Sequence, residues 1–459
     1  MELPADFVLR TRTLLGDAYE QFEKSLDAET PVSIRLNNRK GLAPPSSGET
    51  IPWCNAGYYL PNRLTFTFDP LFHAGGYYVQ EASSMFLEQA IKTYISQPVK
   101  CLDLCAAPGG KSTHLLDLLP EGSLLVSNEV IRNRSLVLAE NITKWGRSNV
   151  IVSNDDPQKI GQLTHYFDLI VADVPCSGEG MFRKDEYSRQ EWSMANVELC
   201  ASRQKRIIHD IWNALKPGGL LIYSTCTYNT AENEENIQYI AENLGAEIQP
   251  LPLPDEWKVC GALKGNIPVS RFLPHKTRGE GFFLAVLRKT EDDSGPVIFK
   301  TKSSKDRKKE SIPSAIQNWL KNSSGFHFNI HNGIVQAYPI IFKEDFLYLT
   351  EKLKIISAGV KVGESKGKDL IPHPALALSD DLDQNSFHRS EISWEEAIRY
   401  LRKEAITIDS EAKKGYHLIT YKNLPLGFVK HLGNRSNNLY PSEWRIRTGY
   451  NPEHLLLFE

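Results

Sequence analysis

The stretch Asp103-Leu-Cys-Ala-Ala-Pro-Gly-Gly-Lys111 decides the fold of this chain. It follows Val99-Lys-Cys-Leu102, a predicted buried strand, and precedes a helix predicted to begin at Ser112. A strand that turns through glycines into a helix lets a ligand approach the backbone and its free N–H groups. The spacing matches neither phosphate-binding glycine motif, so it favours a nucleotide-like ligand without a pyrophosphate, such as S-adenosylmethionine. An ordinary Pro-Gly turn is the alternative.

Strand and helix patterns alternate around this turn, over a domain that we place at residues 96–290. Strands are expected at 99–103, 123–128, 149–152, 167–172, 219–224 and 281–288. Helices are expected at 112–119, 131–145, 198–215 and 232–244. This alternation predicts an α/β fold with a Rossmann-like, doubly wound and mainly parallel sheet. Right-handed crossovers then bring the loops that follow the strands to one edge, where ligands bind.

The flanking sequence predicts further units. Residues 1–95 form a small α+β element, with a helix at 4–30, a strand at 32–36 and a short strand entering a helix at 75–85. Residues 291–310 have little apolar content and predict a solvated linker. The rest predicts a β-rich accessory region, divided into an accessory domain at 311–390 and a last domain at 391–459. Its expected strands are 326–330, 333–337, 346–349, 355–362 and 424–429, and its expected helices are 311–321 and 393–403.

Composition narrows the class of protein. The chain has 459 residues, of which 41% are hydrophobic and 24% are charged, as in globular proteins. It has neither a run of about 18 apolar residues nor a signal peptide, so we expect no membrane span. Its seven cysteines include no C-x-x-C pair, which argues for a reducing cytoplasm and against a disulfide framework or a metal site.

Acidic residues follow successive strands of the predicted sheet. Glu129 ends the second strand, Asp155 and Asp156 follow the third, and Asp173 ends the fourth. A carboxylate in the position of Glu129 accepts both hydroxyls of a ribose. The acids after the third strand lie where an adenine amino group would bind. One acid at a strand end is commonplace, but such a series behind a glycine turn predicts a cofactor site.

Two cysteines reach the same edge of the sheet. The fourth strand leads into Cys176, and the fifth strand leads into Cys226. A lone cysteine is most often a small buried hydrophobe, but two at equivalent strand ends beside a cofactor turn indicate thiol chemistry. The other five are interpreted as structural: Cys54, Cys101, Cys105, Cys200 and Cys260.

Thiol chemistry together with S-adenosylmethionine points to one kind of reaction. Carbon 5 of a pyrimidine is too weakly nucleophilic to attack a methyl sulfonium unaided. A thiolate that adds to carbon 6 makes carbon 5 enamine-like, so that it takes the methyl group before a base removes its proton. Asp173 would hold the ring nitrogen and the exocyclic amine of cytosine. The target base must leave its stack to reach such a pocket.

Three motifs carry a family resemblance. Residues 103–111, Asp173-x-Pro-Cys-Ser-Gly178 and Ser224-Thr-Cys-Thr-Tyr228 resemble the Nol/Nop/Sun family of RNA cytosine-5 methyltransferases, which have the class I methyltransferase fold. Gly178-Glu-Gly-Met-Phe-Arg-Lys184 is similar to the bacterial ribosomal branch. The C-terminal stretches 373–379, 427–433 and 440–441 are similar to the region of that branch that includes a PUA-like RNA-binding domain. The resemblance covers roughly residues 30 to 450.

The resemblance implies a role for each matched residue. Cys226 becomes the nucleophile, Cys176 the second cysteine that resolves the covalent intermediate, and Asp173 a residue of both the catalytic and the cofactor site. The implied cofactor residues are Cys105, Ala106, Ala107, Pro108, Gly109, Gly110, Lys111, Glu129, Arg134, Asp156 and Asp173. Pro157 stands where the family usually has glycine, which leaves open whether Asp155 or Asp156 faces the adenine.

The expected substrate is ribosomal RNA, most directly 16S rRNA, free or in the small ribosomal subunit. Basic and aromatic residues alternate over 421–450, as suits RNA, although a solvated face over an aromatic core gives the same pattern. We expect a cytoplasmic monomer with an RNA-binding element at 1–95. A tRNA-directed enzyme of the same chemistry and a catalytically idle RNA-binding assembly factor are the alternatives. A DNA cytosine methyltransferase would use the Pro-Cys cysteine as nucleophile, and the Thr-Cys on the next strand argues against it.

Overall fold

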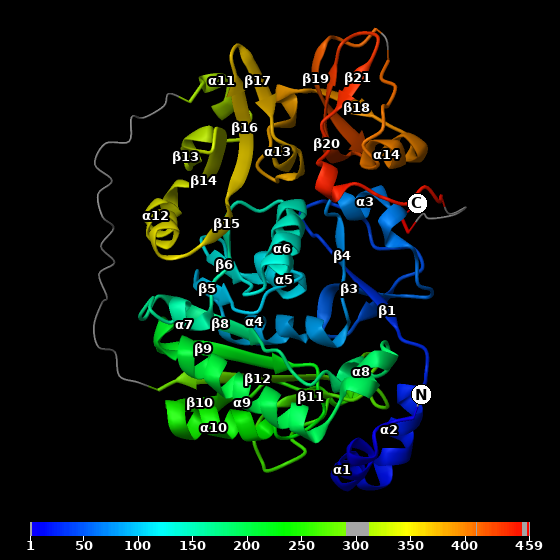
Figure 1. Ribbon diagram of the computed structural model, residues 1–459, viewed down its shortest axis with the longest axis vertical. Coiled ribbons are helices and arrows are strands. Elements are labelled where there is room, and N and C mark those ends of the chain that lie inside the picture. Colours follow the sequence, from blue (N-terminus) through cyan, green and yellow to red (C-terminus); the bar gives the residue numbers. More distant parts are fainter. Residues whose placement is uncertain (1, 291–311, 410, 452–456, 459) are drawn as a thin grey trace.

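The computed structural model describes residues 2–290, 312–409, 411–451 and 457–458, so the predicted linker 291–310 lies outside the described residues. A central sheet lies between the N-terminal helices at one end and two small sheets at the other (Figure 1). None of the helices in the described residues combines the length and the apolar character that a membrane crossing requires.

The central sheet has nine strands within the described residues, in the order β10-β12-β9-β8-β5-β6-β7-β15, with β11 paired to β12. Its bounds are β5 Lys100–Asp103, β6 Leu124–Asn128, β7 Val150–Ser153, β8 Phe167–Asp173, β9 Leu215–Thr225, β10 Ala246–Gln249, β11 Ser270–Phe272, β12 Phe282–Lys289 and β15 Ile355–Ala358. The strands from β5 to β9 pair in parallel, whereas β12 and β15 run antiparallel to their neighbours. The doubly wound α/β fold is therefore confirmed.

Helices cover both faces of this sheet. Their bounds are α4 Leu87–Tyr94, α5 Gly110–Leu118, α6 Arg132–Trp145, α7 Pro157–Ile160, α9 Met194–Ile211 and α10 Glu234–Leu244. Along β8, Leu169 and Val171 pack into the core under α4, α5 and α6, whereas Ile170 packs into the core under α7, α9 and α10. A strand buried on both faces explains the continuous apolar run in its sequence.

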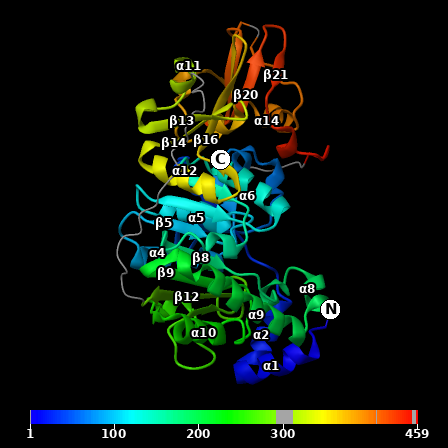
Figure 2. The same ribbon diagram turned by 60° about the vertical axis from the view of Figure 1, so that its left-hand side comes forward.

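The N-terminal part contains two helices, α1 Ala5–Leu15 and α2 Tyr19–Leu26, where the sequence predicted one. The break falls at Gly16, which adopts φ 54°. Phe7 and Phe22 from these helices pack against Phe182 and Trp192, so the pair docks beside α8 Glu186–Glu191 and α9 (Figure 2). Full burial of a phenylalanine contributes about 1.5–3 kcal/mol, which fixes this contact.

A small antiparallel sheet follows these helices and shares a core with the C-terminal domain. It has the strand order β2-β3-β1-β4, with bounds β1 Val32–Leu36, β2 Glu49–Ile51, β3 Cys54–Leu60 and β4 Tyr77–Val79. The short helix α3 Pro70–His73 precedes β4 in the chain. The C-terminal sheet comprises β18 His388–Glu391, β19 Gly415–Tyr421, β20 Leu424–His431 and β21 Ser436–Asn438, with α14 Trp394–Leu401. Ile34 and Tyr77 of the first sheet pack in one cluster with Ile398 and Leu426 of the second. Two parts that are distant in sequence therefore form one body.

The accessory region forms a sheet in the order β13-β14-β16-β17. Its elements are β13 Phe326–His331, β14 Ile334–Pro339, β16 Val360–Lys366 and β17 Asp369–Pro372, with helices α11 Ser314–Gln317, α12 Lys343–Lys352 and α13 Pro374–Leu378. The helix predicted at 311–321 is thus a single turn within the described residues.

Two strand predictions in this region are wrong. The predicted strand 346–349 lies in α12, where the buried Phe346 and Leu349 are one helical turn apart. A continuous apolar run of four residues does not distinguish a short buried strand from part of a helix. The predicted strand 355–362 is broken at Gly359, where φ is 60° and a Cβ would lie 2.3 Å from the carbonyl oxygen of Ala337. Its first half, β15, joins the central sheet beside β7, and its second half, β16, joins the accessory sheet.

Candidate active site

The two predicted cysteines meet at the edge of the central sheet where β8 and β9 end. Asp173, the last residue of β8, pairs in register with Ser224 of β9. Cys176 follows the first of these residues by three positions and Cys226 follows the second by two, so both turn over the same edge. Their Sγ atoms lie 3.2 Å apart. The site therefore holds a close pair of free thiols.

The surroundings of Cys176 disfavour its thiolate form. The hydrogen bond to Cys226 and burial raise the pKa of Cys176 well above its ordinary value. A thiol with a raised pKa keeps its proton at neutral pH, so Cys176 is poorly suited to act as the nucleophile. Either sulfur of the pair can donate the hydrogen bond between them.

Lys111 and Asp173 form an ion pair beside the cysteines. The Lys111 Nζ lies 2.7 Å from Asp173 Oδ2, and the Ser224 hydroxyl donates to Asp173 Oδ1 at 2.7 Å. Burial alone would lower the pKa of Lys111, but the charges of Asp173, Asp103 and Cys226 outweigh it and raise that pKa. The Lys111 ammonium therefore stays charged and stabilises a thiolate at Cys226.

Glu179 ties the Cys176 loop to the residues after Cys226. It is fully buried and accepts the backbone N–H groups of Tyr228 and Asn229, at 2.9 and 3.0 Å. The Arg10 guanidinium of α1 donates to Glu179 Oε1 at 2.7 Å, and so does the Trp192 indole at 3.0 Å. The neighbouring glycines in Gly178-Glu-Gly180 are required too, since a Cβ on Gly180 would lie 2.5 Å from the carbonyl oxygen of Cys226.

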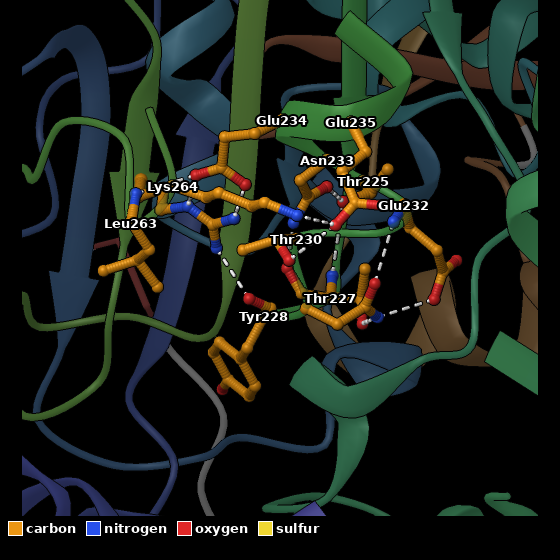
Figure 3. Close-up of polar contacts among 12 residues, drawn as sticks. Thr225, Thr227, Tyr228, Thr230, Glu232, Asn233, Glu234, Glu235, Leu263 and Lys264 are labelled. Carbon is orange, nitrogen blue, oxygen red and sulfur yellow. Dashed lines mark hydrogen bonds and ion pairs between the residues drawn. The ribbon is translucent and has the colours of Figure 1, made fainter. Parts of the chain in front are cut away.

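A second buried carboxylate, Glu232, completes this scaffold. Its Oε2 accepts the Ser177 N–H at 3.0 Å, and its Oε1 accepts the Asn229 side-chain amide at 2.7 Å. The close-up in Figure 3 shows Glu232 next to Asn233, whose amide donates to the carbonyl oxygen of Thr227. Two loops that are 50 residues apart in the sequence are thus held by shared acceptors, which fixes the geometry of the thiol pair.

The segment that follows Cys226 is held by a second set of buried contacts. Glu234, labelled in Figure 3, forms a fully buried ion pair with Arg271, whose guanidinium also donates to the carbonyl oxygen of Tyr228 at 2.8 Å. The Leu263 N–H donates to the same carboxylate at 2.8 Å. Breaking a buried pair of this kind leaves an uncompensated charge, so the segment resists displacement.

The glycine turn lies next to the thiols and begins α5. Gly109 adopts φ 117°, in the left-handed region that favours glycine, and α5 starts at Gly110. Arg134 of α6 donates to the carbonyl oxygen of Ala107 at 2.9 Å, and the Ala106 N–H donates to the carbonyl oxygen of Asn128 at 2.8 Å. The turn of residues 105–111 is therefore braced against β6 and α6. Cys105 is half-buried within it, and burial raises its pKa.

Asp103, which the sequence analysis quoted but did not assign, carries an unsatisfied oxygen at this turn. Its Oδ2 accepts the Ser112 hydroxyl at 2.6 Å, but its Oδ1 is buried and has no hydrogen-bond partner within the described residues. Burial raises the pKa of Asp103 to about 7. Like Glu129, it is an acid at a strand end, and that pattern was the signal that would have found it.

Glu129 and its neighbours complete a surface suited to a nucleoside. The Glu129 side chain is buried, and its Oε1 accepts the Ile131 N–H at 2.9 Å. Arg134 NH1 lies 3.6 Å from Glu129 Oε2. Val130 and Ile131 are 55% and 51% exposed, so apolar side chains stand beside a carboxylate. A carboxylate for ribose hydroxyls, an unpaired buried carboxylate oxygen for an ammonium group and apolar faces for a purine fit S-adenosylmethionine.

Asp155 and Asp156 have different surroundings. Asp155 is buried; its Oδ1 lies 2.5 Å from Lys159 Nζ, and its Oδ2 accepts the Lys354 N–H at 2.7 Å. Asp156 is exposed and caps α7, where it accepts the Gln158 N–H through Oδ1. Both oxygens of Asp155 are therefore engaged, partly by the segment that leads into β15.

One buried group of metal-ligating types occurs away from this edge. Cys54 Sγ lies 3.8 Å from His114 Nε2, which lies 3.2 Å from Glu88 Oε2. Glu88 also accepts the Asn55 N–H and pairs with Lys92. Because these polar atoms bond one another and their neighbours, we interpret the group as a structural hydrogen-bond network.

Comparisons with known proteins agree with this architecture. Family models match residues 95–288 (16S rRNA methyltransferase RsmB/F), 3–82 (N-terminal domain of 16S rRNA methyltransferase RsmF) and 387–446 (methyltransferase RsmF PUA domain). A solved structure, NSun6 from Pyrococcus horikoshii with SFG, has a TM-score of 0.54 at 21% identity. The similarity covers 63% of this chain and 99% of that chain, and it supports the fold alone.

Two curated relatives carry the name ribosomal RNA small subunit methyltransferase F. The protein of Shewanella oneidensis is 32% identical, with 96% of this chain and 94% of the relative covered. The protein of Erwinia tasmaniensis is 29% identical, with 96% of each chain covered. The similarity thus spans nearly the whole length of both. This chain belongs to the ribosomal RNA small subunit methyltransferase F family, a family of RNA methyltransferases whose cofactor is S-adenosylmethionine.

Proposed function

We propose that this protein methylates carbon 5 of a cytosine in 16S rRNA through a covalent bond between Cys226 and carbon 6. The observation that carries the proposal is the pair of free thiols, with Sγ atoms 3.2 Å apart and the raised pKa on Cys176. Two thiols at one edge of the sheet, beside a charged Lys111, suit a reaction that needs one nucleophile and a second group that acts later.

The reaction divides into addition, transfer and elimination. The Cys226 thiolate adds to carbon 6 of the cytosine, and the electron pair moves into the ring so that carbon 5 becomes nucleophilic. S-adenosylmethionine supplies the electrophilic methyl group. A base then removes the carbon-5 proton, the electron pair returns to form the C5–C6 double bond, and Cys226 leaves as the thiolate. Dividing one hard step in this way is covalent catalysis.

Asp173 and Cys176 have separate parts in this scheme. Asp173 is 35% exposed at the edge of the site, so a flipped base can reach its carboxylate. The exocyclic amine of the base would donate to this carboxylate, which orients the ring for the addition. Cys176 acts late, when the adduct loses its proton and releases Cys226. Glu179 and Glu232 act as positioning residues because they hold the two loops.

We assign the cofactor to the surface formed by the glycine turn 105–111 and the acids beside it. Glu129 would take the ribose hydroxyls, and Asp103 would take the ammonium group of the methionine part. Arg134 braces the turn. Of the two acids after β7, Asp156 suits the adenine amino group better, because both oxygens of Asp155 are engaged.

The names of the relatives support the proposed substrate. They give the small subunit ribosomal RNA, so we propose 16S rRNA, free or assembled. We also propose a cytoplasmic monomer. The proposed domains remain 1–95, 96–290, 311–390 and 391–459. A tRNA-directed enzyme is the alternative, whereas the intact thiol pair disfavours an idle assembly factor.

The proposal is tested by the product. Purified protein is incubated with methyl-labelled S-adenosylmethionine and with either 16S rRNA or total tRNA, and the RNA is digested to nucleosides. The expected result is label in 5-methylcytidine from 16S rRNA, with little from tRNA. Label in another nucleoside would overturn the cytosine-5 chemistry, and label confined to tRNA would overturn the substrate.

A further inference from the structure

A groove of about 690 Å³ lies where three parts of the chain meet, away from the thiol edge. Its walls come from the loop after β1, from the segments around α11 and α13, and from the turn between β19 and β20. We call it the basic groove, since its charged lining residues are Arg39, Lys40, Lys321 and Lys422 against the single carboxylate of Asp380. The methylation scheme above does not use it.

The cations that line the basic groove outnumber the carboxylates that line it. Lys321 Nζ donates to the carbonyl oxygen of Asp380 at 2.9 Å, and Lys422 Nζ donates to that of Phe458. A carbonyl oxygen positions an ammonium group without neutralising it, and the carboxylates of Asp381 near Lys321 and of Asp69 near Lys422 compensate these charges in part. Among the groove cations that the structure describes, Lys40 pairs with the carboxylate of Asp380, at 3.2 Å. The Arg39 side chain is exposed.

The cations also repel one another. Burial lowers the pKa of Lys40; Asp380 opposes this effect, whereas the nearby charge of Lys321 adds to it. Burial likewise lowers the pKa of Arg147, with a further contribution from Arg39 of the groove. Like charges brought together from separate parts of a fold lower its stability, and a bound polyanion relieves that repulsion.

The turn between β19 and β20 departs from the usual sequence of a two-residue hairpin turn. Lys422 and Asn423 adopt φ 47° and 64°, the left-handed conformations of a two-residue hairpin turn. Asn-Gly is the usual sequence for such a turn, so the lysine is held in a conformation that favours glycine. This turn places Lys422 in the lining of the groove. A residue held in an unfavourable backbone conformation is typical of a functional position.

The basic groove lies one helix length from the cofactor surface. A Cβ on Gly146, which ends α6, would lie 3.0 Å from Lys40 Nζ and 3.1 Å from Asp380 Oδ1. The other end of α6 begins three residues after Glu129. A helix of 14 residues is about 21 Å long, so a ligand in the groove does not overlap the target nucleotide.

We propose that the basic groove binds the phosphodiester backbone of the RNA substrate at a site remote from the target cytosine. Its cations come from the N-terminal loop, the accessory region and the PUA-like domain, so one RNA segment would contact all three. The proposal rests on the proposed function for the nature of the substrate. It goes beyond it by assigning a binding site outside the catalytic edge.

The test measures binding and not methylation. The variant Arg39→Gln/Lys321→Gln/Lys422→Gln removes three cations and spares the buried Lys40. The control Arg203→Gln/Arg206→Gln/Lys258→Gln removes three exposed cations from α9 and from the loop before β11, outside the proposed RNA-binding element. Filter binding with labelled 16S rRNA is measured from 50 to 300 mM salt, and thermal unfolding of each protein confirms that it is folded.

The groove variant is expected to bind 16S rRNA about tenfold more weakly at low salt. The slope of log affinity against log salt should fall by about 2, since each lost phosphate contact removes about 0.7 for single-stranded RNA. The control should match the wild type. Equal affinity and slope for the groove variant and the wild type would overturn the proposal. So would loss of affinity without a change in slope, or equally effective displacement of the RNA by polyglutamate, which would favour an acidic protein.

Failure of the groove and failure of the proposed function give different results. A groove variant that binds RNA weakly but methylates normally at saturating RNA supports the groove as a remote binding site. If the wild type binds 16S rRNA with this salt dependence but forms no 5-methylcytidine, the groove stands and the proposed reaction fails.

Discussion

The Sγ atoms of Cys176 and Cys226 lie 3.2 Å apart although the residues are 50 positions apart in the sequence. The in-register pairing of Asp173 with Ser224 brings their strands to the same edge. Glu179, in the Cys176 loop, accepts the Asn229 N–H from the other loop, and Glu232 accepts from both Ser177 and Asn229, so the two carboxylates fix the loops. The strand register and the two buried carboxylates therefore determine the contact between the two thiols.

Glu129→Ala is expected to weaken binding of S-adenosylmethionine by about 1–3 kcal/mol, because the ribose hydroxyls lose their acceptor in a buried site. Titration calorimetry of the folded variant measures this directly. Glu121→Ala, which changes an exposed glutamate in the loop before β6, serves as the matched control and should bind like the wild type. Unchanged affinity for Glu129→Ala would remove this residue from the cofactor site.

Glu179→Gln is expected to lower the free energy of unfolding by about 2–3 kcal/mol, because Arg10 and two backbone N–H groups lose a charged acceptor. Methyl transfer should slow as well, since the loops that carry Cys176 and Cys226 loosen. Urea unfolding and single-turnover rates measure the two effects. Glu191→Gln, at an exposed position of α8, is the control. A variant as stable and as active as this control would show that Glu179 does not hold the site.

Asp103 should make stability depend on pH. Burial raises its pKa to about 7 in the folded state, whereas an unfolded aspartate has a pKa of about 3.9. Between these values the folded state holds a proton that the unfolded state has released. This contribution to stability is therefore fully present below pH 4, and it is lost at up to about 1.4 kcal/mol per pH unit as the pH rises to 7.

Asp103→Asn should lack this loss. Its free energy of unfolding, relative to the wild type, should increase steadily from pH 4.5 to 6.5 in urea unfolding experiments. Ser112→Ala removes the hydrogen bond that lowers the pKa of Asp103, and should extend the loss to higher pH. Parallel stability curves for the wild type and Asp103→Asn would contradict the raised pKa.

The sequence predicted the parts of the fold that repeat a regular pattern. Cys176, Cys226 and Glu129 were placed at one edge because parallel strands all end there. The strand predicted at 346–349 is wrong because Phe346-Leu-Tyr-Leu349 is a continuous apolar run, and such a short run does not distinguish a buried strand from part of a helix. The pairing of β15 with β7 was out of reach, since nothing local in Ile355–Ala358 indicates a partner 200 residues earlier.

The supporting contacts of the site were also out of reach. Glu179 and Glu232 are ordinary acids in the sequence. Only the folded chain shows that both of them accept hydrogen bonds from Asn229. The engagement of Asp155 by the Lys354 N–H depends on the same long-range pairing. The groove formed by Arg39, Lys321 and Lys422 likewise requires three parts of the chain to meet.

The different parts of the two cysteines are tested most directly by trapping the RNA adduct. Cys176→Ala should still form the bond between Cys226 and carbon 6 but should release it slowly, because the late step is impaired. Cys226→Ala and the double variant should form no bond, since the nucleophile is missing. Each protein is mixed with 16S rRNA and S-adenosylmethionine and is examined by denaturing gel electrophoresis.

The account predicts a protein–RNA band that survives denaturation for Cys176→Ala and is absent for Cys226→Ala and for the double variant. A stable band for Cys226→Ala together with none for Cys176→Ala would reverse the two roles and contradict the central claim.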